Sequence, residues 1–115
     1  MKYRGVCKET GEWVVGMADS NKNIVKKYTE NGEEKFIGIP VEPRTITPYI
    51  GIQDKFGNDL FEGDIIEIDS FVFSGRYVIT WDNKGLRYIF LANDGYLIYQ
   101  DFKNEDFYKV DCIYE

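Results

Sequence analysis

The sequence predicts a mainly β protein, either a sandwich or a small barrel, and two observations support that prediction. Aromatic residues make up 17% of the 115 residues, and such side chains favour the half-buried, pleated surface of a sheet. Turn signals recur about every eight to twelve residues, with short strand-like runs between them. A chain of this length also buries enough surface to fold without disulfides or metal.

The first predicted hairpin joins residues 3–8 to residues 12–18. Residues 9–11 form its turn, which ends in a glycine. Residues 13–17 are almost continuously apolar, and this predicts a strand that is covered on both faces.

The second predicted hairpin joins residues 24–29 to residues 33–39 through Asn31-Gly32. Asn-Gly is the strongest short-range hairpin signal, because a type I′ turn needs a positive φ at both central residues. Residues 19–23 form the turn before this hairpin and consist of residues that hydrogen-bond their own backbone.

A proline-marked segment separates the two halves of the chain. Pro40, Pro43 and Pro48 bracket a stretch that can be neither a central strand nor a helix. We therefore expect an N-terminal β-subdomain at residues 1–50 and a second β-subdomain at residues 51–115.

The second half also consists of short strands and tight turns. The predicted strands are residues 64–69, 72–81, 86–92, 96–99 and 108–114. Gly75 interrupts the second of these, as in a bent or bulged strand. Residues 100–107 fit a loop and a single helical turn equally well. The sequence shows no internal repeat.

The charge balance disfavours partners that are themselves anionic. The chain has 20 acidic and 14 basic residues and a net charge of −6, whereas binding to a nucleic-acid backbone needs clustered Lys and Arg. The one dense basic cluster, Lys22, Lys26 and Lys27, is interpreted as a solvated hairpin face. We expect neither nucleic acid nor membrane as a partner.

The expected compartment bears on the state of the two cysteines. No stretch resembles a signal peptide or a membrane span, so the expected compartment is the cytoplasm, where thiols stay reduced. Cys7 and Cys112 are interpreted as buried thiols, which become neighbours if the end strands pair.

Histidine, the side chain most often used for acid–base catalysis, is missing. The chain has no histidine, which excludes Ser-His-Asp and Cys-His constellations and most zinc sites. Glu62 and Asp64 are the nearest thing to a catalytic carboxylate pair. We interpret Asp64 as a hydrogen-bond acceptor for the tight turn at Gly63 instead, and we expect no catalytic, cofactor-binding or metal-binding residue.

One segment imitates a calcium-binding loop. Four oxygen-bearing side chains occupy positions 1, 3, 5 and 12 of an EF-hand pattern, namely Asp19, Asn21, Asn23 and Glu30. The sixth position, where the EF-hand needs glycine, is Ile24. The segment is therefore interpreted as a polar hairpin turn.

Four large aromatic residues have either a structural role or a role in ligand recognition. Trp13, Tyr49, Trp81 and Tyr88 are either core residues whose polar atoms reach a partner, or a recognition surface. The sequence favours the core.

Three segments of the chain carry a distinctive pattern. The first is Arg4-Gly5 followed by residues 11–16, the second runs from Thr45 to Ile66, and the third is residues 110–115. Together they resemble the YopX family, which consists of small proteins carried by phages and prophages. The second is the most specific because its turn and strand residues come in one order and spacing. The matching positions are Gly5, Trp13, Gly16, Thr45, Tyr49, Gly51, Asp54, Gly57, Glu62, Gly63, Asp64, Ile113 and Tyr114.

The resemblance implies a fold but no chemistry. It implies that residues 51–115 form an SH3-like small barrel and that the Glu62-Gly63-Asp64 motif is a fold signature. It supplies no catalytic residues. Asp111-Cys112 departs from the Gly-Asn pair of similar sequences and leaves the role of that turn open.

The expected function is therefore that of a non-enzymatic phage or prophage accessory protein in the bacterial host cell. Its expected partner is a host or phage protein, with a homo-oligomer as a further expectation because exposed sheet edges invite pairing. The alternatives are a carboxylate- or metal-dependent enzyme and a nucleic-acid-binding SH3-like module.

Overall fold

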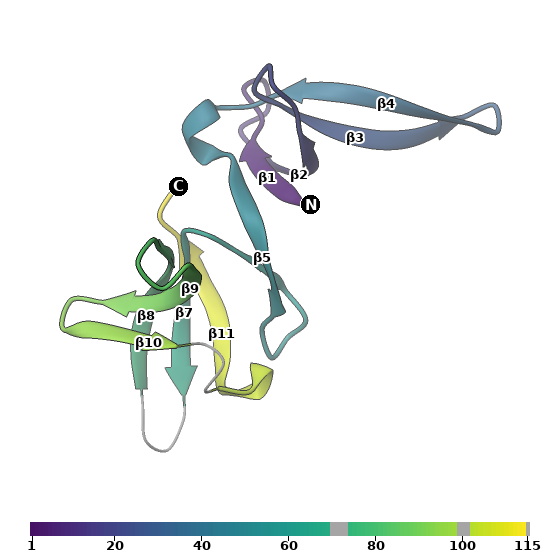
Figure 1. Ribbon diagram of the computed structural model, residues 1–115. Coiled ribbons are helices and arrows are strands. Elements are labelled where there is room, and N and C mark those ends of the chain that lie inside the picture. Colours follow the sequence, from purple (N-terminus) through teal and green to yellow (C-terminus); the bar gives the residue numbers. More distant parts are fainter. Residues whose placement is uncertain (70–73, 99–101, 115) are drawn as a thin grey trace. The chain divides into compact units, whose positions relative to one another are not determined.

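The structure is a computed structural model that describes residues 1–69, 74–98 and 102–114. It is mainly β, which confirms the predicted fold class. The chain divides into two compact units, Met1–Tyr49 and Ile50–Glu115 (Figure 1).

The first unit is built on two successive hairpins. Its strands are β1 (Tyr3–Val6), β2 (Trp13–Ala18), β3 (Asn23–Glu30) and β4 (Glu33–Pro40), followed by the short 3-10 helix η1 (Pro43–Thr45) and the start of β5 (Thr47–Gln53). β1 pairs with β2 on one side and with the first residues of β5 on the other. The sheet order β4-β3-β2-β1-β5 leaves β4 at an edge.

β3 and β4 form a long hairpin with the predicted turn (Figure 1). Asn31 and Gly32 have φ angles of 53° and 78°, as a type I′ turn requires. The Lys27 ammonium lies 2.8 Å from the Glu34 carboxylate across the two strands. Lys27 therefore lies beside an acidic neighbour.

Two glycines of the first unit allow close approach between segments. A Cβ on Gly5 would lie 2.9 Å from the side chain of buried Val41. A Cβ on Gly16 would overlap the carbonyl oxygen of Val25. Both glycines are therefore required by packing.

The second unit contains a five-stranded antiparallel sheet. The elements of this unit after β5 are β6 (Asp59–Phe61), β7 (Asp64–Asp69), β8 (Ser74–Asp82), β9 (Arg87–Ala92), β10 (Gly95–Ile98), the 3-10 helix η3 (Asn104–Asp106) and β11 (Phe107–Cys112). β6 is the neighbour of β5 and is not part of the five-stranded sheet. The order is β10-β9-β8-β7-β11, so the last strand returns beside β7. Within the described residues β10 does not pair with β11, and the sheet is open, not a closed barrel.

Two expectations for the second half concern segments at the limits of the described chain. The strand predicted at 72–81 is β8, which is described from Ser74, so residues 72 and 73 lie outside the described residues. Of the segment 100–107, residues 104–106 form one 3-10 turn, while residues 100 and 101 lie outside the described residues.

The core of the second unit is aliphatic and aromatic. Its buried residues are Ile50, Leu60, Ile66, Ile68, Ile79, Phe90 and Phe107. The rings of Phe90 and Phe107 meet edge to face with centroids 5.3 Å apart. β7 alternates between buried and partly exposed residues, which is the pattern of a strand with one face on a core.

Gly63 provides a direct test of this packing. Its φ is +89°, and a Cβ there would overlap the ring of Tyr114. We expect Gly63→Ala to lower the free energy of unfolding by about 2–4 kcal/mol, because backbone strain and steric overlap add. Urea unfolding followed by circular dichroism measures this loss.

Gly57→Ala is the matched control for that experiment. Gly57 has a φ of +82°, but no atom lies within 4 Å of its added Cβ. Only strain then remains, and we expect a loss of about 1–2 kcal/mol. Equal losses in the two variants would contradict the packing role of Gly63.

Candidate functional site

Arg4 is a buried cation in the first unit, only 2% exposed. Its Nε donates a hydrogen bond to Thr47 Oγ1 at 3.1 Å, and its guanidinium lies 4.3 Å from the centroid of the Trp13 ring. A buried charge needs such partners, and a planar guanidinium suits an aromatic face. Trp13 therefore has a structural partner within its own unit.

Thr45 and Tyr49 attach the segment after β4 to β1. Thr45 Oγ1 accepts the Val6 N–H at 2.8 Å and donates to the Glu42 carbonyl at 2.6 Å. The Tyr49 N–H donates to the Lys2 carbonyl at 2.8 Å, and the Lys2 ammonium lies 4.4 Å from the centroid of the Tyr49 ring. Both matching positions thus hold backbone segments together.

The segment that imitates a calcium loop is a hairpin turn. Asp19 Oδ1 accepts the N–H groups of Asn21 and Asn23, each at 2.9 Å, and Oδ2 accepts Nδ2 of Asn23 at 3.1 Å. The Glu30 carboxylate lies 3.8 Å from the Lys35 ammonium. In the described part of the chain no group of three or more cysteine, aspartate and glutamate side chains is placed to hold a metal ion.

The same turn occurs a second time, at Asp54. Its Oδ1 accepts the N–H groups of Phe56 and Asn58, each at 2.9 Å, and its Oδ2 accepts Nδ2 of Asn58 at 3.1 Å. The fourth residue of each turn has a positive φ, 64° at Lys22 and 82° at Gly57.

The two turns share a short sequence pattern. Both follow the spacing Gly-x-x-Asp-x-x-x-Asn, which begins at Gly16 in one turn and at Gly51 in the other. This spacing was visible in the sequence and could have predicted both turns.

Asp54 also reaches the last strand. Its Oδ2 accepts the Lys109 N–H at 2.9 Å, and the neighbouring Lys55 N–H donates to the Phe107 carbonyl at 3.1 Å. Asp54 is only 3% exposed. The turn therefore covers the outer edge of β11, the side that faces away from β7.

Lys109 connects Asp54 to the second buried carboxylate. Its ammonium lies 3.3 Å from Asp64 Oδ1, while Asp64 Oδ2 accepts the Phe61 N–H at 2.9 Å. Asp64 is fully buried. A carboxylate held by a backbone N–H and an ammonium is a structural element of the turn, as the sequence suggested. Sequence reasoning did not identify Lys109.

Gly63 links the middle motif to the closing motif. Its N–H donates to the Ile79 carbonyl at 2.8 Å, and its own carbonyl accepts the Ile113 N–H at 3.0 Å. Tyr114 lies against Gly63 at the position where a Cβ would be. Glu62 is partly buried beside this turn. Segments that are far apart in the sequence thus meet at one glycine.

Trp81 and Tyr88 form a cross-strand pair in the second unit. They lie opposite each other on β8 and β9, with ring centroids 4.9 Å apart in an edge-to-face arrangement. Trp81 Nε1 donates to Asn83 Oδ1 at 2.7 Å. Each of the four large aromatic residues therefore has a ring or cation partner inside its own unit.

Both cysteines are buried thiols. β1 pairs with β2 and β5, whereas β11 pairs with β7, so the two end strands do not pair with each other. Hydrogen bonds from Thr10 and Glu9 hold the pKa of the Cys7 thiol below its ordinary value.

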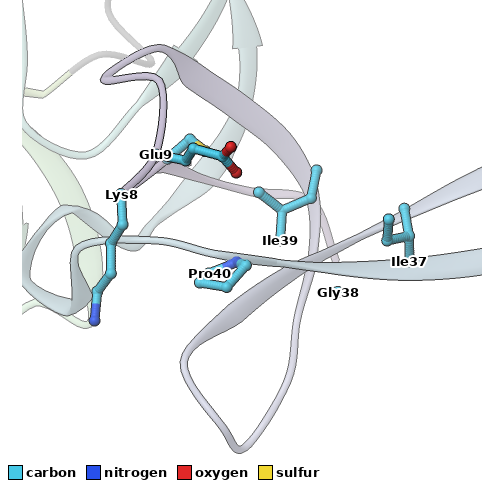
Figure 2. A pocket seen from close by; sticks show the side chains of 7 residues that line it. Lys8, Glu9, Ile37, Gly38, Ile39 and Pro40 are labelled. Atoms are coloured by element: carbon cyan, nitrogen blue, oxygen red, sulfur yellow. The ribbon is translucent and has the colours of Figure 1, made fainter.

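A groove at the base of the β3–β4 hairpin is the best candidate for a binding site. It has a volume of about 370 Å³ and is lined by Cys7, Lys8, Glu9, Ile37, Gly38, Ile39 and Pro40. Figure 2 shows the side chains of Ile37, Ile39 and Glu9 on one side of β4 and Lys8 on the other. The lining is mainly apolar, with one charge of each sign.

Exposed apolar side chains lie on both faces of β4 beside this groove. Phe36 is 64% exposed and Ile37 is 52% exposed. β4 is an edge strand, so these side chains flank unpaired backbone groups. Sequence reasoning recognised this strand but not its exposed edge, because alternation alone does not show whether a strand is central.

The Asp54 carboxylate should be a main source of stability in the second unit. Asp54→Asn replaces an acceptor oxygen with an amide that faces the donors of Lys109 and Asn58. We expect a loss of about 2–4 kcal/mol in the free energy of unfolding, measured by urea denaturation. Asp19→Asn, with the same turn but no second strand to hold, is the control and should lose less. A larger loss for Asp19→Asn would contradict this role.

The stability of the second unit should also depend on Asp54 ionisation. Burial by itself would raise the pKa of Asp54, but the hydrogen bonds from Lys109, Asn58 and Phe56 together outweigh it and hold the pKa below its ordinary value. The carboxylate therefore contributes its full stabilisation above the unfolded pKa of about 3.9 and loses it as the pH falls further.

We therefore expect the difference in unfolding free energy between the wild type and Asp54→Asn to shrink as the pH falls from about 6 to about 3. Denaturant titrations at several pH values measure this difference. A difference that stayed constant or grew on acidification would contradict the assignment.

One of the comparisons with known proteins identifies the family of this chain. None of the helices in the described residues has the length and hydropathy of a membrane span. No curated protein matches the chain, and no solved structure matches it either. The family model described as YopX protein matches residues 2–115. The chain therefore belongs to the YopX protein family.

Proposed function

We propose that this chain is a non-enzymatic protein-interaction module, an accessory protein of a phage or prophage that acts in the cytoplasm of the bacterial host. The observation that carries the proposal is the exposed edge of β4 beside an apolar groove. Phe36 and Ile37 are more than half exposed there, and the groove is lined by Ile37, Ile39 and Pro40. Exposed apolar side chains beside an open edge strand are typical of protein-binding surfaces.

The placement of the buried carboxylates supports a non-enzymatic role. Among the described residues Asp54 and Asp64 are the buried acids, and each accepts at least one backbone N–H group. A general acid or base needs an oxygen that can reach a substrate. These oxygens instead accept hydrogen bonds that stabilise turns and the last strand, so a structural role explains why the two carboxylates are buried.

The charges around the β4 edge support a protein partner over a nucleic acid. Lys27 and Lys35 lie close to Glu34 and Glu30, and Glu9 lines the groove. Phosphate backbones bind where cations cluster without such acidic neighbours. A mixed, partly apolar surface suits another polypeptide.

Affinity capture from host lysate tests this proposal. We expect the wild-type chain to retain a host or phage protein in near-stoichiometric amount, identified by mass spectrometry. Phe36→Glu places a charge on the exposed edge and should reduce recovery at least about tenfold. Phe36 is 64% exposed, so the variant should unfold at the same denaturant concentration as the wild type.

Phe56→Glu is the matched control, because Phe56 is 69% exposed and lies in the second unit. It should retain the same protein as the wild type. Equal recovery with Phe36→Glu and wild type would contradict the assignment of the β4 edge as the binding surface.

A further inference from the structure

The outer edge of β4 exposes the backbone groups of Glu34, Phe36 and Gly38. The hairpin turn has two residues, so Glu30 and Glu33 exchange both backbone hydrogen bonds, and this pattern recurs at every second residue. The N–H and C=O groups of the odd-numbered residues of β4 therefore point to β3. Those of the even-numbered residues point outward, and among the described residues no strand pairs with them from Glu34 to Gly38.

This open edge ends at the groove. Pro40 has no N–H, and its carbonyl already accepts the Lys8 N–H at 3.0 Å. Cys7 forms a bridge to Val41 immediately beyond. A strand added to β4 therefore has space opposite residues 34–38 but not opposite Pro40.

We propose that this edge pairs antiparallel with the same edge of a second copy of the chain, about a two-fold axis at Phe36. The proposal rests on the proposed function and names the partner for the same surface. In this register Phe36 lies opposite Phe36, and Glu34 of each copy lies opposite Gly38 of the other. All outward N–H and C=O groups of these three residues are then paired.

Neighbouring registers are less favourable. An axis at Lys35 places two lysines directly opposite each other, which is destabilising. An axis at Ile37 places Glu34 opposite Pro40, where Lys8 already occupies the edge. With the axis at Phe36 the added strand ends beside Ile39, and only its hairpin turn enters the groove.

Charge complementarity supports the same register. Lys8 pairs with Pro40, so it lies on the face of β4 that carries Phe36 and Gly38, opposite the side chains of Ile37 and Ile39 (Figure 2). Glu34 of the second copy lies opposite Gly38 on this face, about 7 Å along the edge from Lys8. The two-fold axis produces this Lys8–Glu34 attraction twice.

The size of the interface indicates a reversible dimer. Each copy contributes one short strand edge and an exposed phenylalanine, which is less than a standard interface. We therefore expect a dissociation constant in the range of about 1–100 μM.

Sedimentation equilibrium over a range of concentrations tests the association. We expect the mass to rise from the 13.5 kDa of one chain to twice that value. Phe36→Glu places two carboxylates opposite each other and should weaken association by roughly a hundredfold or more. Phe56→Glu should associate as the wild type does. A wild type that stays monomeric at several hundred micromolar would overturn the proposal.

Cysteine cross-linking tests the register. Lys35 of one copy lies opposite Ile37 of the other, in a non-hydrogen-bonded pair whose Cβ atoms are about 5 Å apart. A mixture of Lys35→Cys and Ile37→Cys chains should therefore form a disulfide-linked dimer on mild oxidation, and neither variant should do so alone. Cross-linking of Lys35→Cys alone or of Ile37→Cys alone would overturn the register.

The two experiments separate this proposal from the proposed function. A monomeric wild type whose captured protein is lost with Phe36→Glu would retain the interaction surface and overturn self-pairing. A dimer lost with Phe36→Glu, with no other protein captured, would support self-pairing as the interaction made by this surface.

Discussion

The second unit depends on one buried carboxylate, that of Asp54. It accepts four hydrogen bonds, from the N–H groups of Phe56, Asn58 and Lys109 and from Nδ2 of Asn58. These bonds shape the turn before β6 and attach it to β11. The ammonium of Lys109 in turn forms an ion pair with Asp64, and the Asp64 carboxylate accepts a hydrogen bond from the turn before β7. A carboxylate that accepts several N–H groups while excluded from water is among the strongest polar anchors a small domain has.

The outer edge of β11 is covered by other backbone segments, whereas the outer edge of β4 is mostly open. Asp54 and Lys55 cover the outer edge of β11 with backbone and side-chain hydrogen bonds. In the part of the chain that the structure describes, the outer edge of β4 is covered only at Pro40, where Lys8 pairs with it. Proteins usually protect edge strands, because open N–H and C=O groups pair with any available chain. An open edge that also carries exposed Phe36 is therefore where we place the interaction surface.

Much of the fold was predictable from local signals. Asn31-Gly32 predicted a type I′ turn, because both central residues of that turn have a positive φ and few residue types other than Asn and Gly adopt one readily. The interpretation of Asp64 as a turn acceptor is confirmed by its bond to Phe61. The roles of Lys109 and Arg4 were not predictable, because each acts on a residue far away in the sequence. Barrel closure was expected from resemblance, but strand pairing decides closure, and β10 and β11 do not pair within the described residues.

The sequence by itself determined the strands, their turns and the exclusion of histidine chemistry, because turn geometry and residue type are local properties. It also contained the repeated Asp-x-x-x-Asn turn. Only the tertiary structure decided which of the two turns holds a second strand and which β-strand edge stays open. Those outcomes depend on which backbone groups find partners across the fold, and composition and spacing do not specify those partners. The groove beside β4 exists for the same reason, since the Lys8–Pro40 pairing closes the edge at that point.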